Sequence, residues 1–289
     1  TRVGTALIAV GLGIKSAIVP LHTWLPDAHG RAPSSISAML SGIIVQSALY
    51  ALLKTVLSCG LPLRTLGTLL IGASLLNMTI GNALALVQVN TKRLLAYSTI
   101  AQVGYVMLGV GIGLRYGIPE AVQAGFFLLI AHAAMKGLAF LCKGVAHFYC
   151  DATSIAQLQR TVHRLPLISV AMSLALAGLA GVPPLAGFAG KWLILTQVLR
   201  SPDWIAYAAL AVFVLNGLVA LGYYLPLIAT LFVYRANLTV DPGERVAISA
   251  WMALPIVVLG GLILAIGLYP TPWLQWTAGV GPYLLALGG

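Results

Sequence analysis

The segment Leu176-Ala-Gly-Leu-Ala-Gly-Val-Pro183-Pro-Leu-Ala-Gly-Phe-Ala-Gly-Lys191 lies inside an apolar stretch, residues 165–199, that is too long for one membrane crossing. Its proline pair removes two backbone donors and clashes with the preceding turn, so the helix is expected to break there. Freed backbone groups are tolerated in a membrane only where they are buried or line a wet cavity, and broken helices mark ion sites in secondary transporters. A break near 181–191 with a lysine beside it therefore predicts an ion pathway.

The composition of the whole chain is that of a polytopic membrane protein. Hydrophobic residues make up 60% of the 289 residues and charged residues only 8%, against roughly 25% charged residues in soluble domains. Apolar stretches recur at close to the ~20 residues that cross a bilayer, and each must be a helix because no water satisfies its backbone. We therefore expect an all-α protein with about eight transmembrane helices, two of them broken. Their ranges are 3–20, 35–57, 65–88, 94–114, 120–148, 165–199, 204–234 and 246–269, followed by a short apolar tail at 272–288.

The first span has the same features as the sixth, because it ends at Pro20 and Pro26 and carries Lys15 close to the break. A charged side chain at the centre of a bilayer is costly, so such residues usually belong to an ion or proton pathway. Alternatively, the prolines only kink a packed helix and each lysine snorkels to the surface. Lys54, at the edge of the second span, is expected to snorkel, and His29 beside the first break is expected at the membrane interface.

The fifth span carries four titratable residues on one helical face. His132, Lys136, Lys143 and His147 occupy relative positions 0, 4, 11 and 15, which project within about 60° of one another. The row is about 22 Å long. Histidine titrates near neutrality and a desolvated lysine can lose its proton, so the row can relay protons. For Lys143 and His147, near the end of the span, snorkelling is an equal alternative.

The sequence argues against several other classes of function. The formal charge is +10, but the basic residues are spread over short loops and spans rather than gathered into a patch, which disfavours nucleic-acid binding. Cys59, Cys142 and Cys150 form no CxxC motif, and neither a haem-ligating histidine pair nor a dinucleotide fingerprint is recognisable. No nucleophile and base converge as a membrane enzyme would need. We therefore expect no cofactor in this chain.

Loop charge favours one orientation in the membrane. Basic residues are more frequent in cytoplasmic loops, and the loops after the first, third, fifth and seventh spans hold more of them than the opposite side. The first set is Arg31, Lys92, Arg93, Arg160, Arg164, Arg235 and Arg245, and the second is Arg2, Lys54, Arg64, Arg115 and Arg200. The side that carries Arg31 is therefore expected to be cytoplasmic.

Four blocks of the chain carry a family resemblance. They are Lys15-Ser-Ala-Ile-Val-Pro20-Leu-His-Thr-Trp-Leu-Pro26-Asp-Ala-His-Gly-Arg-Ala-Pro33, Lys92-Arg-Leu-Leu-Ala-Tyr-Ser98-Thr-Ile-Ala-Gln-Val-Gly-Tyr105, His132-Ala-Ala-Met-Lys136 and the segment quoted first. In this order they resemble the antiporter-like, proton-translocating subunits of respiratory complex I, membrane-bound hydrogenases and multisubunit cation/proton antiporters. The resemblance implies two inverted five-helix repeats, each with one broken helix. By the same resemblance, Lys15 looks like the pump lysine, Lys136 like the central lysine with His132 beside it, and Lys191 like the terminal lysine.

The chain departs from this family in two places. Gln46 stands at a lysine position and Ser41 at a histidine position of the helix after the first break; each can continue a wet path or simply bond a neighbouring helix. The family also pairs its first lysine with a glutamate on an earlier helix, for which this chain has no equivalent. We therefore expect the C-terminal part of a longer subunit, with a preceding segment or a separate chain supplying the glutamate. The expected parts are 1–57, the end of the first repeat; 58–234, the second repeat; and 235–289, a C-terminal helix and tail.

These expectations define one main function and two alternatives. The main one is proton translocation along a mid-membrane axis of lysine and histidine in a complex I-like or hydrogenase-type redox complex, with the redox chemistry in other membrane subunits. The first alternative is a subunit of a multisubunit Na+(K+)/H+ antiporter. The second is a structural subunit that has lost transport. The expected location is a prokaryotic inner membrane, with an organelle inner membrane or a thylakoid as alternatives.

Overall fold

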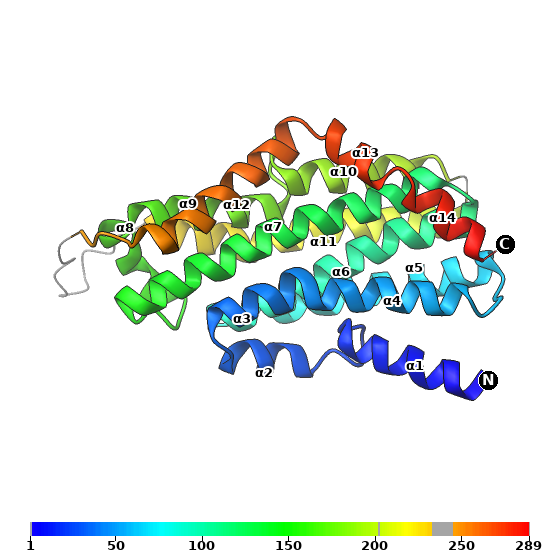
Figure 1. Cartoon of the computed structure of the whole chain (residues 1–289), viewed down its shortest axis with the longest axis horizontal. Helices are drawn as coiled ribbons and strands as arrows, with labels where there is room; N and C mark the ends of the chain where they lie inside the picture. The colour runs from blue at the N-terminus through cyan, green and yellow to red at the C-terminus, as the bar shows by residue number, and fades with distance from the viewer. Residues whose placement is uncertain (1, 202, 233–244, 289) are drawn as a thin grey trace.

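The computed structural model describes residues 2–201, 203–232 and 245–288. These residues form a bundle of helices, and the described ranges contain no β-strand. Figure 1 shows the long helices running side by side along the long axis of the molecule. Arg235 and the boundary expected at 234–235 lie outside the described residues.

A long helical hairpin, residues 91–150, lies inside the bundle, and the other helices pack around it. The first half holds α1 (Arg2–Lys15), α2 (Trp24–Arg31), α3 (Ser34–Met39), the π-helix η1 (Leu40–Ile44), α4 (Val45–Leu57), α5 (Leu63–Leu86), α6 (Thr91–Tyr116) and α7 (Pro119–Cys150). The second half holds the short 3-10 helix η2 (Ala156–Arg160), α8 (Thr161–Arg164), α9 (Pro166–Ala180), α10 (Ala186–Leu199), α11 (Trp204–Phe232), α12 (Ala250–Leu268), α13 (Thr271–Thr277) and α14 (Val280–Leu287).

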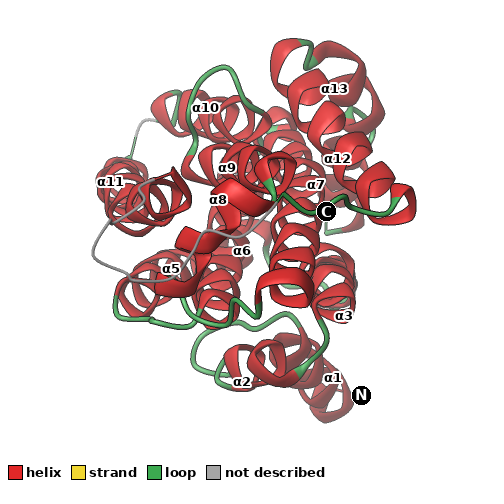
Figure 2. Cartoon of the chain, turned by 90° about the vertical axis from the view of Figure 1, so that its left-hand side faces the viewer, coloured by secondary structure: helices red, strands yellow, loops and turns green. Residues whose placement is uncertain are grey.

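Six helical segments among the described residues are long and apolar enough to cross a membrane, as in a multi-pass membrane protein. They are Ser34–Leu57, Leu63–Leu86, Thr91–Tyr116, Pro119–Cys150, Trp204–Phe232 and Ala250–Leu268. The apolar window of α6 is 94% buried and that of α12 only 22%. Figure 2, which looks along the bundle, accordingly places α6 inside the bundle and α12 on its outside.

Local sequence sets the ends of α6 and α7. The side chain of Asn90 caps α6 by accepting hydrogen bonds from the backbone N–H groups of Lys92 and Arg93, at 2.9 and 3.2 Å. The helix ends at Gly117, whose φ of +68° is a left-handed conformation that glycine adopts without steric cost. Pro119 opens α7, where its missing N–H would have no helical partner in any case. The two longest buried helices are thereby joined by a very short turn.

Close packing between α5 and α6 depends on small residues. A Cβ on Gly67 would lie 2.5 Å from the backbone nitrogen of Arg115, and a Cβ on Gly104 would lie 2.8 Å from the carbonyl oxygen of Ser74. Membrane helices approach this closely where small residues face each other. The core helix α6 therefore packs tightly against α5, so the neighbours of its polar side chains are fixed by the packing.

The break in the first apolar stretch comes earlier than expected. The predicted span runs to Pro20, but α1 ends at Lys15 and Ala17 has a φ of +54°. Asn77 of α5 satisfies the freed backbone, because its Oδ1 accepts from the N–H of Val19 at 2.9 Å and its Nδ2 donates to the carbonyl of Ala17 at 3.4 Å. Hydropathy could not place this end, since the stabilising amide comes from a distant helix.

The second interruption lies between α9 and α10. α9 ends at Ala180, Gly181 follows with a φ of +93°, and α10 begins at Ala186. Near the C-terminus, the segment expected as an apolar tail folds into α13 and α14 instead. α14 packs on α7, where a Cβ on Gly281 would overlap the carbonyl of Pro119.

Candidate functional site

Lys136 lies at the centre of the bundle, fully buried on α7. Its Nζ donates a hydrogen bond to the carbonyl oxygen of Leu95 at 2.7 Å and a second one to the hydroxyl of Ser98, both on α6. No carboxylate of the described residues pairs with it. Uncharged oxygen atoms alone hold this amine, so no anion fixes the proton on it.

Lys191 occupies a second site of the same kind, on α10 just after the interruption. Its Nζ donates to the carbonyl oxygens of Leu179 and Ala180 at 2.9 and 3.1 Å. These are the last carbonyls of α9, which have no helical partner and form the negative end of the helix dipole. The amine also lies 4.9 Å from the ring centroid of Tyr105. The broken helix thus supplies the oxygen atoms that bind the lysine.

Two polar side chains of α6 connect these sites. Ser98 accepts from Lys136, and Gln102, one turn further along, donates from its Nε2 to the carbonyl of Leu179 at 3.0 Å. That carbonyl is also bound by Lys191. The hydroxyl of Tyr224, on α11, lies close to both Ser98 and Gln102. Lys136 and Lys191 are therefore linked through one polar strip of α6.

Three residues of this connection, Ser98, Gln102 and Tyr224, were not expected in the site from the sequence. A signal was present, because a serine and a glutamine four residues apart lie on one face of an otherwise apolar helix. Tyr224 had no such signal, since only the fold brings α11 beside α6.

His132, the neighbour of Lys136 in the predicted row, faces a different helix. Its Nδ1 lies 2.8 Å from Nε2 of Gln46 on α4, and both side chains are buried. The approach of α4 is made possible by η1, where a Cβ on Gly42 would lie 3.2 Å from the carbonyl of Ala133. In the described chain His132 does not bond Lys136 directly. Gln46 therefore approaches the Lys136 site by its contact with His132.

Ser41, the other departure from the family pattern, reaches the central lysine by a second route. Its hydroxyl lies 2.6 Å from that of Thr99, which donates to the carbonyl of Leu95 at 3.0 Å. The same carbonyl accepts from Lys136. Neutral side chains thus join the helix after the first break to the central site.

The far end of the predicted row reaches the surface. Lys143 is buried and donates to the carbonyl of Ala152, in the loop after α7. His147 is exposed, and its Nδ1 lies 3.5 Å from a carboxylate oxygen of Asp151. Lys143 and His147 therefore lie at one mouth of the bundle, each with a partner of its own.

Lys15 and Lys54 differ from the other lysines because both side chains are exposed on the described chain. Lys15 ends α1, and the structure does not bring it into contact with Lys136 or Lys191. Lys54 lies near the end of α4, as expected for a snorkelling residue.

The expectation that His29 is interfacial is wrong. The imidazole is fully buried and stacks on Phe140 of α7, with ring centroids 4.8 Å apart and an interplanar angle of 12°. Neither ring nitrogen has a hydrogen-bond partner among the described residues. Lys136, one turn from Phe140, lies within electrostatic range. Proximity to a predicted break suggested the interface, but α2 packs inward on α6 instead.

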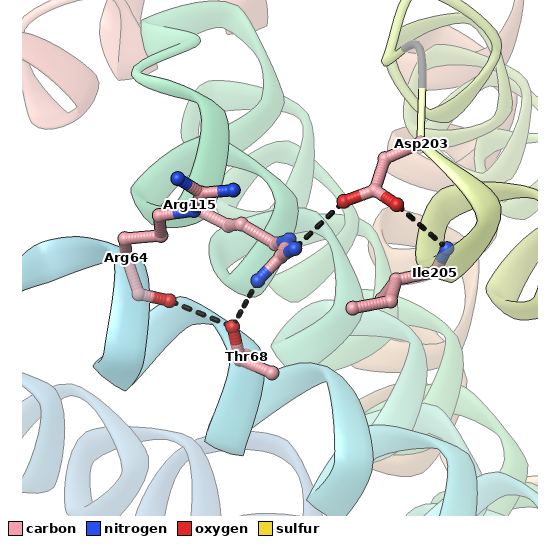
Figure 3. Close-up of polar contacts among 5 residues, drawn as sticks. All are labelled: Arg64, Thr68, Arg115, Asp203 and Ile205. Atoms are coloured by element: carbon pink, nitrogen blue, oxygen red, sulfur yellow. Dashed lines mark hydrogen bonds and ion pairs between the residues drawn. The ribbon is translucent and has the colours of Figure 1, made fainter.

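One strongly bonded ion pair lies at the opposite end of the bundle (Figure 3). Arg115, at the end of α6, donates to a carboxylate oxygen of Asp203 at 2.7 Å and to the hydroxyl of Thr68. The second carboxylate oxygen of Asp203 accepts from the backbone N–H of Ile205 at 3.3 Å, and Thr68 donates to the carbonyl of Arg64 at 2.7 Å. The Arg115 guanidinium lowers the pKa of the Asp203 carboxyl below its usual range. This network ties α5, α6 and the start of α11 together.

The described residues also define what the chain offers to a metal. No three His, Cys, Asp or Glu side chains within the described ranges gather as a metal ion would require. Cys59 is exposed, whereas Cys142 and Cys150 are buried. The polar groups of the interior include amines, amides, hydroxyls, imidazoles and carbonyls.

The chain as a whole is similar to subunits of several known membrane complexes. NADH-quinone oxidoreductase subunit N of Geobacter metallireducens is 34% identical over 281 residues, which cover 96% of this chain and 57% of that protein. The membrane-bound sulfane sulfur reductase, an archaeal respiratory membrane complex, contains a chain with a TM-score of 0.84 and 30% identity, covering 98% of this chain and 56% of that one. A chain of the Mrp complex from Dietzia sp. DQ12-45-1b has a TM-score of 0.78 and 25% identity, covering 100% of this chain and 61% of that one.

The chain thus spans little more than half the length of the relatives it matches. The family described as NADH:quinone oxidoreductase/Mrp antiporter, transmembrane, matches residues 1–218 of the 289. More than half of the chain is therefore covered by a single family description, and we conclude that the protein belongs to the NADH:quinone oxidoreductase/Mrp antiporter transmembrane family.

Proposed function

We propose that this chain is the proton-conducting part of a membrane subunit in a complex I-like or hydrogenase-type redox complex. The observation that carries the proposal is the polar strip of α6 between the two lysines: Ser98 accepts from Lys136, and Gln102, one turn further along, donates to the carbonyl of Leu179 that Lys191 also binds. Family membership supports it, because the relatives named above belong to respiratory and antiporter complexes. The redox-driven proton translocation of the whole complex is proposed together with this role of the chain.

The proposed step is the transfer of a proton between two amines that alternate between charged and neutral forms. A proton loaded on Lys136 and a charge arriving at a neighbouring site repel each other, and this repulsion drives the proton onward. Ser98 and Tyr224 can both donate and accept, whereas the amide of Gln102 positions water and holds no proton charge. The free lone pairs of Gln102 Oε1 and Tyr224 Oη add binding capacity for water along this strip.

Three side chains are proposed for the entry to Lys136. His29 offers two unbonded ring nitrogens beside the central site, and His132 joins Gln46 to it. His29→Phe keeps the stacking on Phe140 while removing both nitrogens. If this variant translocates protons at the wild-type rate, His29 has no part in the route.

The membrane architecture is proposed from the same features. α1 with α2, and α9 with α10, are proposed as two broken spans, which together with the six long helices make eight. Residues 58–234 then form the second inverted repeat and 1–57 the end of the first. A glutamate from a preceding segment or another chain is the proposed partner of Lys15, whose exposed side chain on the described chain supports that assignment. The redox groups are assigned to other subunits of an inner-membrane complex.

The function is tested by Lys136→Met in the assembled complex, reconstituted in proteoliposomes. Proton translocation per electron transferred should fall strongly, while the melting temperature should stay unchanged or rise, because an apolar residue of similar volume replaces a buried amine. Lys54→Met removes an exposed lysine of the same chain and should leave both quantities unchanged. Wild-type proton translocation in Lys136→Met would remove the central role from this lysine.

A cation/proton antiporter subunit is the second candidate. The similarity to a chain of the Mrp complex favours it. Exchange of Na+ for H+ across vesicles that contain no electron donor or acceptor would establish this alternative. Proton movement that requires electron transfer would exclude it.

A further inference from the structure

Two adjoining cavities lie where the end of α7 meets α2, the start of α6 and α12. The smaller one has a volume of about 190 Å³ and the larger one about 470 Å³. They share Arg31, Lys92 and His147. Neither cavity takes part in the polar strip between Lys136 and Lys191, so the proposed proton route does not account for them.

The smaller cavity concentrates positive charge from three side chains. Arg31, Lys92 and Lys143 line it together with the polar side chains of Asn90 and Thr153. No aspartate or glutamate belongs to the described residues that line either cavity. Such a cavity favours a ligand that carries negative charge and several oxygen acceptors.

Two carboxylates lie near the cavities, but neither lines them. Asp27 accepts from Arg93 at 2.9 Å, and Asp151 lies 3.5 Å from His147 on the exposed side. Asp151 also acts electrostatically on Lys143, whereas Arg31 and Lys92 have no carboxylate partner among the described residues.

The cations that face the cavity keep unused donors. Nζ of Lys92 gives one hydrogen bond, to the carbonyl of Ala32 at 2.8 Å, and Nζ of Lys143 gives one, to the carbonyl of Ala152. An ammonium group has three donors, so each lysine has further donors to offer. Arg31 is exposed and forms no ion pair in the described ranges. Its guanidinium can bind a phosphate in a bidentate manner.

The larger cavity adds apolar surface to the basic residues that it shares with the smaller one. Leu141, Val145, Phe148 and Met252 contribute apolar surface to it, and the side chain of Phe148 is 71% exposed. Met252 belongs to α12, whose apolar window is only 22% buried, so this cavity opens toward the surroundings of the bundle. A cationic inner part and an apolar outer part match a ligand with a charged head and a hydrocarbon chain.

We propose that this composite site binds an anionic phospholipid, with the phosphate at Arg31 and Lys92 and an acyl chain along α7 and α12. Basic pockets between transmembrane helices on the cytoplasmic side are suited to such head groups. The loop-charge bias predicts that this end faces the cytoplasm. The site rests on charge complementarity and shape, and it stands independently of proton translocation.

A third cavity provides an internal comparison. It has the same volume, about 470 Å³, and lies at the opposite end of the span formed by α3 and α4. Among the residues that the structure describes, Lys54 is the only charged one that lines it. One exposed cation without a cluster should not select an anionic head group over a zwitterionic one.

The test measures lipid binding to the full-length protein by native mass spectrometry after delipidation. Phosphatidylglycerol should bind in preference to phosphatidylcholine, and Arg31→Gln combined with Lys92→Gln should weaken phosphatidylglycerol binding by about tenfold or more. Lys54→Gln should leave it unchanged. Arg31→Gln alone removes an exposed side chain that supports no other described contact, so it tests the site even if the double variant folds poorly. Arg31→Lys should restore most of the binding.

Three results would overturn the proposal. The first is equal binding of the two lipids by the wild type, and the second is equal phosphatidylglycerol binding by wild type and Arg31→Gln. The third is saturation of the site by millimolar inorganic phosphate without any dependence on acyl chains, which would assign the cluster to a free anion instead of a lipid.

Discussion

The interior lysines and the arginine at the end of α6 show two ways of placing a cation in the same bundle. Lys136 and Lys191 are held by carbonyl and hydroxyl oxygens. Arg115 is held by the carboxylate of Asp203. A guanidinium is always charged and matches a carboxylate in shape, whereas an amine can exist in a neutral form. The comparison teaches that the two kinds of cation differ in their partners: a carboxylate pairs with Arg115, whereas the proton exchange proposed for the lysines rests on neutral oxygen atoms that fix no proton.

The largest expected effect comes from removing an interior amine. Lys191→Met should lower proton translocation by about 100-fold or more, the scale of a missing proton-transfer group. The melting temperature should change little, because methionine fills the volume and no carboxylate is left unpaired. Translocation is measured in proteoliposomes beside Lys54→Met as the control. Unimpaired translocation in Lys191→Met would contradict the proposed difference in role between the interior lysines and Arg115.

A smaller effect on proton translocation should follow when the carbonyl oxygens of Leu179 and Ala180, which bind Lys191, are displaced while the amine is kept. A Cβ on Gly187 would overlap the carbonyl of Gly178, so Gly187→Ala should push α10 away from α9. Overpacking of this kind costs about 1–3 kcal/mol. We expect a lower melting temperature together with reduced translocation. Gly217→Ala is the matched control, since nothing lies within 4 Å of its added Cβ. Equal melting temperatures and equal translocation in the two variants would show that the position of the carbonyl oxygens around Lys191 does not matter.

Breaking the structural pair should change stability alone. Arg115→Met leaves Asp203 without its guanidinium and Thr68 without a donor, so the melting temperature should fall by a few degrees. Proton translocation per electron should stay at the wild-type value in the molecules that remain folded. Thermal unfolding and pumping are measured on the same preparation. A specific loss of pumping with unchanged melting would place Arg115 in the proton route.

The smallest effect is the pH dependence of that pair. The pKa of Asp203 is lowered from its ordinary value of 3.8, mainly by the hydrogen bond from Arg115. A lowered folded-state pKa gives stability that is present above the unfolded-state pKa and is lost as the pH falls through the folded-state value. The melting-temperature gap between wild type and Asp203→Asn should therefore be constant from about pH 7 to pH 5 and close below about pH 4. A gap that persists at pH 2 would mean that the carboxylate charge plays no part.

Sequence patterns identified the titratable residues but not their partners. Lys136 and Lys191 stand out because lysine is rare in apolar stretches, and Pro183 predicts an interruption that the helix ends at Ala180 and Ala186 match in position. Periodicity also puts His132 on the same face as Lys136. Periodicity could not show that His132 faces α4 and Lys136 faces α6. A small difference in angle around the helix axis is enough to select a different neighbouring helix.

Long-range partners escaped prediction for the same physical reason. Asp203 pairs with a residue 88 positions earlier in the chain, and Gln102 bonds a carbonyl 77 positions later. Such pairs are created by helix packing, which hydropathy and local periodicity do not encode. His29 was misjudged because its local context describes a break, while its burial depends on α6 and α7.

The measurement that tests the central claim most directly gives an interior lysine the kind of partner that Arg115 has. Ser98→Asp places a carboxylate where a hydroxyl now accepts from Lys136. If proton transfer requires an amine without a fixed anion, proton translocation per electron in proteoliposomes should collapse while the protein stays folded, and Ser98→Ala should retain part of the activity. Wild-type translocation in Ser98→Asp, with the carboxylate shown to be ionised by infrared spectroscopy, would contradict the account.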